Sequence, residues 1–469
     1  MLTRLTSLLA VGAVLALSPQ RLRPQSDPNF KFAVSNDQAV AHFRAGVTDY
    51  QNFSFESAHS HFKAALDADP AFGLARVMWA ATGPVPGEVA KEVDRGVADA
   101  ATRGNTGEVL LALATKEAIL GHADAAKTLY SAAAQLDPND RFAAFQAPGG
   151  FNGSLQYYRD FASRFPDYAL TYNQLAYIEW AAGNKDAAIA AAKRQVELNP
   201  SAPNPHDTYA EILQWNGDFA GATAHYKQAA SLTPKFPEAY AGLAEVAALQ
   251  GHYDQARAYL NQAIANAWYP QQRVSYMRQI AGTYAMEGTS PPSLLKALEA
   301  AAAEAKTSGD SSQAAIIYSQ IAATQAALGN TAASHQALAT ATSLGGPVPW
   351  NVHYFGAMAH GQLKHSAPAQ EELAKLKADS AAPKSRVAAV EGYLLTQQGK
   401  PADALNVLMA ADTTDLIVMN RIAEAHAALG HTDEAAKWYA RINSNYALTL
   451  QDFTNVNSRR RAKMAVAKR

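Results

Sequence analysis

The sequence of 469 residues contains no cysteine. The chain therefore forms no disulfide, binds no metal through thiolates, and has neither a cysteine nucleophile nor a lipid-bearing N-terminal cysteine. An excess of either charge is also missing, because 40 basic and 41 acidic residues give a formal net charge of −1. Proteins that hold nucleic-acid backbones usually carry a strong basic excess, so we expect no nucleic-acid partner.

Long hydrophobic runs are confined to the N-terminus. Arg4 precedes an apolar stretch from Leu5 to Leu17, which is shorter than the roughly 20 residues that a membrane-spanning helix needs. This pattern is typical of a secretory signal, and an uncleaved anchor is the alternative. We expect residues 1–17 to be a signal peptide and residues 18–36 a proline-broken linker. The mature protein is then periplasmic or secreted and has no membrane span.

The composition favours helices. Hydrophobic residues make up 48% of the chain and charged residues only 17%. Much of the apolar fraction is alanine, which is the best helix former and lets helices cross closely. A sheet protein would contain more valine, isoleucine and threonine.

The chain repeats itself with a period set by its prolines. Pro200 and Pro234 lie 34 residues apart, and Pro70 and Pro138 lie 68 residues apart, which is twice that period. We number each repeat so that its proline takes position 32, which places the start of the first repeat at Ala39. Small residues then recur at positions 8 and 20, an aromatic residue at position 24, and a glycine at position 15, where two helices would turn. The small residues at position 8 are Gly46, Ala114, Ala176, Ala210 and Ala244; those at position 20 are Ala58, Ala126, Ala188, Ala222 and Ala256; the turn glycines are Gly121, Gly183, Gly217 and Gly251; and the aromatics are Phe62, Tyr130 and Tyr226.

This pattern resembles the tetratricopeptide repeat, in which about 34 residues form one hairpin of two helices. Small residues let the two helices approach closely, glycine suits the turn, and proline ends the second helix. Residues 169–266 are the closest to this family, and residues 171–234 look like a pattern common in bacterial exported or multidomain tetratricopeptide proteins. The resemblance implies an all-α fold, a right-handed superhelical solenoid of antiparallel helix hairpins.

The register also divides the chain. We expect residues 37–344 to form a first superhelix, which is most regular at 169–266. We expect residues 345–450 to form a second block and residues 451–469 a basic C-terminal tail. Three segments rich in glycine and proline interrupt the repeats, and the third is the best candidate for a boundary between the blocks. These segments are residues 82–87, 147–153 and 345–350, and a fourth irregular stretch covers 286–293.

Signatures of catalysis are scarce. None of the 13 histidines has the H-E-x-x-H spacing of a helical zinc pair, and neither G-x-S-x-G nor G-x-G-x-x-G occurs. We therefore expect no enzyme activity, no metal site and no cofactor. An enzyme with a site in the irregular loops is one alternative interpretation.

The resemblance places binding on the concave face, which helix A of each repeat lines. Carried onto the most regular repeats, the groove positions fall on aromatic, amide and acidic residues and on no lysine or arginine. We expect a monomeric scaffold that binds a protein or peptide segment, and a basic segment suits these charges best. The groove residues are Asn173, Tyr177, Trp180, Asp207, Glu211, Gln214, Trp215, Glu238 and Glu245.

The basic tail leaves a second alternative open. The segment from Ser458 to Arg469 holds a cluster of basic residues that is able to contact anionic lipid or a nucleic acid. They are Arg459, Arg460, Arg461, Lys463, Lys468 and Arg469. This would suit an envelope assembly factor apposed to the membrane. A solvated helix end, whose charges offset the helix dipole, is the simpler interpretation of the same residues.

Overall fold

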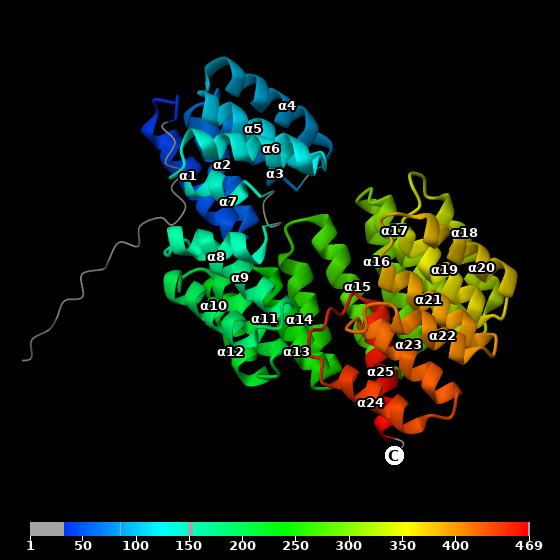
Figure 1. Ribbon diagram of the computed structural model, residues 1–469. Helices are drawn as coiled ribbons and strands as arrows, with labels where there is room; N and C mark the ends of the chain where they lie inside the picture. Colours follow the sequence, from blue (N-terminus) through cyan, green and yellow to red (C-terminus); the bar gives the residue numbers. More distant parts are fainter. Residues whose placement is uncertain (1–31, 85, 149–152, 468–469) are drawn as a thin grey trace, which may run out of the picture.

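The computed structural model describes residues 32–84, 86–148 and 153–467, so the predicted signal peptide and most of the predicted linker lie outside the described residues. The described chain consists of 25 helices and contains no strand (Figure 1). The expected all-α solenoid is therefore confirmed. None of the helices in this part of the chain combines the length and the apolar character needed to cross a membrane.

Most consecutive helices pack as antiparallel hairpins that stack on one another. The array opens with α1 (Asp37–Gln51), α2 (Phe55–Ala68), α3 (Gly73–Ala81), α4 (Pro86–Arg103), α5 (Thr106–Ile119), α6 (Ala123–Leu136) and α7 (Arg141–Gln146). It continues with α8 (Leu155–Arg164), α9 (Ala169–Ala181), α10 (Lys185–Leu198), α11 (Pro203–Trp215), α12 (Phe219–Leu232), α13 (Pro237–Leu249) and α14 (Tyr253–Asn266).

The second half begins with three longer helices, which absorb the extra residues around 286–293. These are α15 (Pro270–Glu287), α16 (Pro291–Thr307) and α17 (Ser311–Ala327). The remaining helices are α18 (Thr331–Ser343), α19 (Trp350–Gln362), α20 (Ser366–Ala378), α21 (Lys384–Gln397), α22 (Pro401–Met409), α23 (Leu416–Ala428), α24 (Thr432–Asn443) and α25 (Phe453–Ala467).

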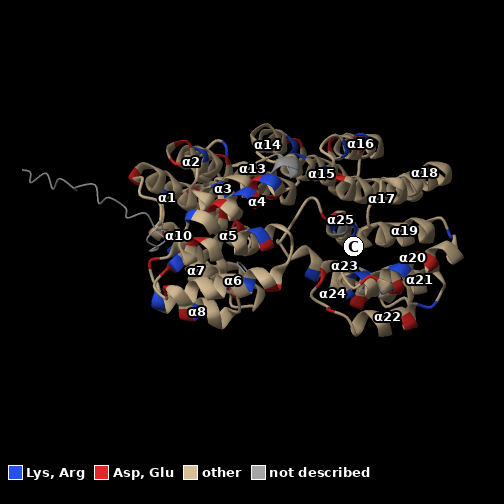
Figure 2. Ribbon diagram, turned by 90° about the horizontal axis from the view of Figure 1, so that it is seen from above, with Lys and Arg blue, Asp and Glu red and all other residues tan. Residues whose placement is uncertain are grey.

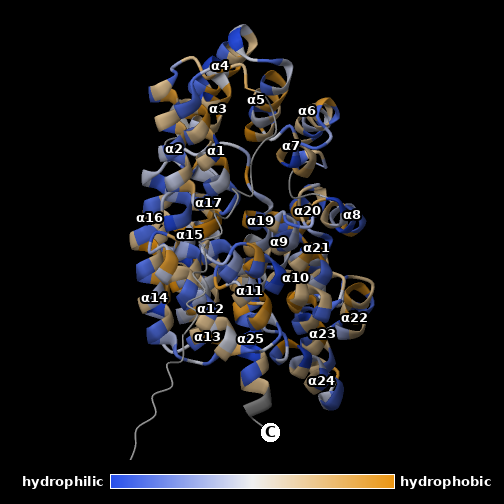
Figure 3. Ribbon diagram, turned by 90° about the vertical axis from the view of Figure 1, so that its left-hand side faces the viewer, coloured by the Kyte–Doolittle hydropathy of each residue, from blue (hydrophilic) through white to orange (hydrophobic). Residues whose placement is uncertain are grey.

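The predicted register is confirmed by burial. Every small residue at positions 8 and 20 is buried, and the three repeat aromatics are at most 6% exposed. At Gly46 an added Cβ would lie only 2.7 Å from the ring of Phe62, so the first hairpin closes because this position is glycine. Hydrophobic residues accordingly gather where helices face one another (Figure 3).

The irregular segments change helix lengths without stopping the stack. The first, at 82–87, shortens α3 to nine residues, and the second leaves α7 with six. The segment 345–350 separates α18 from α19, yet Ala315, Ala341 and Val352 share one buried cluster across it. Packing therefore continues past this segment.

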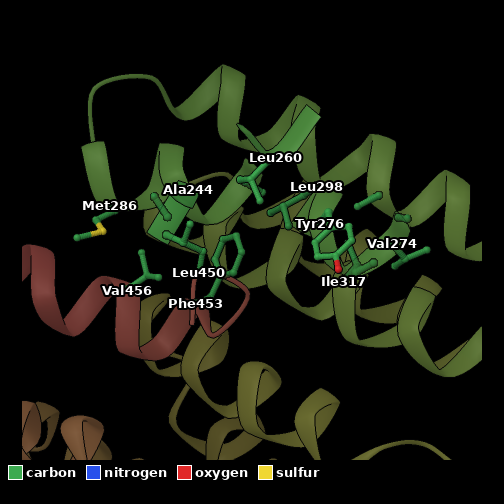
Figure 4. Close-up of a cluster of buried hydrophobic side chains, with 14 of the residues drawn as sticks. Ala244, Leu260, Val274, Tyr276, Met286, Leu298, Ile317, Leu450, Phe453 and Val456 are labelled. Carbon is green, nitrogen blue, oxygen red and sulfur yellow. The ribbon is translucent and has the colours of Figure 1, made fainter. Parts of the chain in front are cut away.

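The C-terminal segment returns to the inside of the array. After α24 the chain runs as an extended segment from Asn445 to Asp452, which we call the strap, and it then forms α25. Helix α25 contacts both α15 and α23 and lies between them (Figure 2). Leu450, Phe453 and Val456 enter the largest buried cluster of the molecule, beside Leu260 and Met286 (Figure 4). Residues 453–467 of the expected basic tail thus form a packed helix.

Candidate functional site

The predicted groove residues lie on three neighbouring first helices of the regular repeats, α9, α11 and α13, which contact one another in this order. The structure therefore brings them onto one face, which we call the inner face. Two of the predicted groove residues are buried and form hydrogen bonds within the fold. Asn173 is 3% exposed and donates to the Thr208 hydroxyl at 2.7 Å, while the fully buried Gln214 accepts from Tyr226.

Three aromatic residues form a partly exposed step on this face. Trp215 contacts Tyr177 and Trp180, with ring centroids 5.7 and 5.8 Å apart. Lys185 lies over the Trp180 ring, with its Nζ 5.1 Å from the ring centroid. The step both packs between hairpins and leaves ring surface for a ligand, because all three side chains are only half-buried.

Four carboxyl groups share the inner face, and we call Asp207, Glu211, Glu238 and Glu245 the acidic face. All four are half-buried. Glu211 accepts a hydrogen bond from the Tyr177 hydroxyl at 2.7 Å, and Glu238 accepts one from Gln272 at 2.9 Å. Within the described chain, no lysine or arginine forms an ion pair with any of the four. The charge of this surface is therefore not neutralised by direct ion pairs.

Burial and mutual repulsion shift the protonation of these groups. Burial raises the pKa of Glu238 to about 7, and burial together with the charge of Glu211 raises the pKa of Glu245 to about 8. Burial and three neighbouring carboxylates hold the pKa of Asp207 well above its usual value. A cation that binds here would favour the ionised forms and release protons.

The strap crosses one end of the inner face. The Tyr446 ring contacts Phe219, and an added Cβ at Gly217 would lie 3.0 Å from it. Farther along, Ser275 donates to the Gln451 side chain at 2.6 Å. At Gly282 an added Cβ would lie 1.9 Å from the Leu450 carbonyl oxygen, so only glycine allows the strap to approach α15 this closely.

Arg459 on α25 also approaches the acidic face. Its side chain is 3% exposed, and it donates to the Asn445 carbonyl and, at 2.8 Å, to the Ala447 carbonyl. Burial lowers the pKa of this guanidinium to about 10, and the charge of Glu245 acts in the opposite direction. The chain therefore supplies one arginine of its own to the edge of the acidic face.

A different surface lies farther along the array. A cavity of about 270 Å³ is bounded by α15, α16, α17, α19, α23 and α25, and we call it the arginine cavity after Arg421, Arg460 and Arg461. Arg421 and Arg461 both donate to Glu424, whereas Arg460 has no partner among the described residues. Burial and the charge of Arg461 lower the pKa of Arg460. Among the other lining atoms, the buried Gln320 Oε1 and Asn420 Oδ1 have no hydrogen-bond partner.

Sequence reasoning placed the acidic face but missed the strap and the arginine cavity. One signal was present: Leu448, Leu450, Phe453 and Val456 are apolar residues in an otherwise polar segment. Such residues indicate that a segment packs against something. The spacing alone does not say which of the preceding helices receives them.

Comparison with known proteins agrees with this geometry. Two tetratricopeptide repeat families match the sequence, one over residues 169–201 and the other over residues 216–267. The matched segments include α9 and α13 of the inner face, and α11 lies between them in the sequence. A comparison with curated proteins gives no match.

Three solved structures illustrate the likeness. A tetratricopeptide repeat protein of Thermus thermophilus is 26% identical, with 36% of this chain and 96% of that chain covered and a TM-score of 0.33. The pilF protein of Pseudomonas aeruginosa is 16% identical over 46% and 93% of the two chains, with a TM-score of 0.34. A tetratricopeptide repeat protein of Parabacteroides merdae is 12% identical over 62% and 99%, with a TM-score of 0.36.

Because these TM-scores are all below 0.5, we base the family on the two sequence matches and on the repeat register. The matched residues coincide with the hairpins whose small, aromatic and turn positions follow the 34-residue period. Stacked repeats of this kind present extended surfaces to other proteins. Residues 169–201 and 216–267 are thus tetratricopeptide repeats, and repeats of this kind imply a protein-interaction scaffold.

Proposed function

We propose that this protein is a non-catalytic scaffold whose acidic face binds an extended, basic segment of a partner protein. The observation that carries the proposal is the strap. An extended segment of the chain itself lies across one end of this face, with Tyr446 against α12 and Arg459 close to Glu245. A partner segment with an aromatic and a basic residue would repeat these contacts on the uncovered part.

The chemistry of the uncovered part supports a cationic ligand. Asp207 and Glu211 lie one turn apart on α11, and Glu238 lies on the neighbouring α13. Burial, and after it repulsion by the neighbouring carboxylates, raises the pKa of Asp207. Lysine or arginine side chains of a ligand would relieve that repulsion. The aromatic step beside Glu211 adds surface on which such side chains stack.

The test is a binding titration of fluorescent peptides by polarisation. A peptide with two arginines and one tyrosine should bind, and the same peptide with glutamate in place of arginine should bind at least about 10-fold more weakly. Asp207→Asn and Glu238→Gln should each weaken binding of the basic peptide. Glu299→Gln, at an exposed position of α16, is the matched control and should leave binding unchanged.

The proposal also fixes a pH dependence. Cations prefer the ionised acidic face, and the pKa of Glu238 is about 7 and that of Glu245 about 8. Affinity for the basic peptide should therefore rise between pH 6 and pH 8.5, with proton release on binding. Equal affinity for the basic and acidic peptides, or an affinity that falls over this pH range, would refute the acidic face as the binding surface.

We further propose that the scaffold works outside the cytoplasm, as a monomer. Arg4 and the apolar stretch of residues 5–17 support export. Fractionation of the native cell with N-terminal sequencing of the mature chain tests this. A chain that keeps residue 1 and stays in the cytoplasmic fraction contradicts it.

A further inference from the structure

We propose that His335, His360 and His365 form a binding site for a divalent transition-metal ion such as Zn²⁺. The three residues come from three parts of the fold: α18, the last turn of α19, and the residue that precedes α20. Their ligating nitrogens all lie within 4.8 Å of one another. The spacing of the histidines along the chain does not point to this site, because a whole loop separates His335 from the other two.

The geometry needs only a small adjustment to hold an ion. The ring centroids are 5.6 Å apart for His335 and His360, 5.3 Å for His335 and His365, and 6.0 Å for His360 and His365. A tetrahedral Zn²⁺ ion with Zn–N bonds of about 2.0–2.1 Å sets its ligand nitrogens about 3.4 Å apart. The ligating nitrogens must therefore approach one another by at most about 1.4 Å, which small rotations of the three histidine side chains about χ1 and χ2 supply.

The three imidazoles have no competing partner among the described residues. None of them forms a side-chain hydrogen bond with another group in this part of the chain, and the Nδ1 atom of His360 is buried without a partner. A buried ring nitrogen without a hydrogen bond costs free energy. Coordination of a metal ion would satisfy it.

The surroundings favour a dication. Burial and the neighbouring His335 and His365 lower the pKa of His360, so the neutral form that ligates metal prevails. Glu371 and Glu372 of α20 act on His360 with the opposite sign, and both form ion pairs with Lys375. Three protein ligands leave the fourth position of a tetrahedral ion open to water or to a group from outside.

A second hairpin of the same protein lacks the third ligand. His426 and His431 span the α23–α24 turn with the same separation as His360 and His365, and their Nδ1 atoms are 3.4 Å apart. His335 of α18 lies six residues after the turn glycine Gly329. The equivalent position of α22, six residues after the turn glycine Gly399, holds Leu405. This hairpin is therefore a matched control for a pair of histidines without the third.

The experiment uses the full chain without a histidine tag. Titration with Zn²⁺ in a calorimeter should give one ion per chain, and Co²⁺ should give the intense absorption bands of a tetrahedral site. His335→Gln, His360→Gln and His365→Gln should each weaken binding by at least about 10-fold, and His431→Gln should leave it unchanged. Binding should weaken from pH 7.5 to pH 5.5 as the histidines are protonated.

Two results would overturn the proposal. One is His335→Gln binding Zn²⁺ as tightly as the unaltered chain; the other is His431→Gln losing as much affinity as His360→Gln. Because His335 is exposed, its variant should keep the melting temperature of the metal-free protein, so lost binding is not lost folding. Zn²⁺ should raise the melting temperature of the unaltered chain and leave that of His335→Gln unchanged.

Discussion

The acidic face and the arginine cavity lie on the same array but carry opposite charges: carboxyl groups gather on the first and arginines around the second. On α11 and α13, four carboxyl groups lie together without an ion pair to lysine or arginine of the described chain, and their pKa values are raised. Around the cavity, Arg421 and Arg461 share the single carboxylate of Glu424. A net charge of −1 therefore conceals two separate surfaces of opposite sign. Net charge says little about what a repeat protein binds locally.

The strap lies at the border between the two regions, because α15 receives the strap and also lines the cavity. The largest effect should come from Gly282→Ala, whose Cβ would meet the Leu450 carbonyl at 1.9 Å. We expect a loss of about 3 kcal/mol in the free energy of unfolding, measured with urea. Gly356→Ala is the control, since the atoms nearest its added Cβ belong to the Glu372 side chain, at 3.2 Å or more, and not to backbone. An unchanged midpoint for Gly282→Ala would show that the strap is not seated on α15.

Removal of a carboxylate should destabilise the cavity region. Burial opposes ionisation of Glu424, but Arg421 and Arg461 outweigh it, and the pKa lies below its ordinary value. Glu424→Gln leaves the buried Arg421 without its charge partner, so we expect a loss of about 2 kcal/mol at pH 7. The loss should shrink as the pH falls below the ordinary pKa of glutamate, because the native ion pair is then also lost. Stability that does not change at pH 7 would contradict this assignment.

A glutamate-to-glutamine substitution on the acidic face should instead increase the stability of the protein. The folded-state pKa of Glu245 is about 8, above its ordinary value. Ionisation of Glu245 therefore lowers the free energy of unfolding progressively as the pH rises from about 5 to about 8. Glu245→Gln removes this cost, and we expect a gain of about 1 kcal/mol at pH 8, discounted for partial exposure, and almost none at pH 5. Thermal melting at both pH values measures the change in stability. A lower melting temperature of Glu245→Gln at pH 8 would contradict the contrast between the acidic face and the arginine cavity.

The smallest effect concerns Arg460. Because this guanidinium has no partner in the described chain and the positive charge of Arg461 acts on it, a dianion such as sulfate should stabilise the protein by about 0.5 kcal/mol at millimolar concentration. The stabilisation should be absent in Arg460→Ala and should remain in Lys463→Ala, an exposed position of the same helix. Equal stabilisation of both variants would mean that sulfate acts through general salt effects.

The inner face shows how far sequence reasoning reached. The repeat positions of Tyr177, Asp207 and Glu211 follow from the 34-residue period, and these residues do lie on adjacent helices. The same rule placed Asn173 and Gln214 in the groove, although both are buried and hold hairpins together. A repeat position specifies the side of a helix but not the exposure of its side chain, because exposure depends on the neighbouring residues in space.

The sequence by itself determined the repeat, its register and its helices. Those features depend on contacts within one hairpin, where small residues, a turn glycine and a proline act over a few residues. Only the tertiary structure decided that the strap and α25 return to the inside of the array, that Arg459 approaches Glu245, and that three histidines converge. These contacts join residues far apart in the chain. No local period records them, because the superhelix brings distant residues together by summing small rotations over many hairpins.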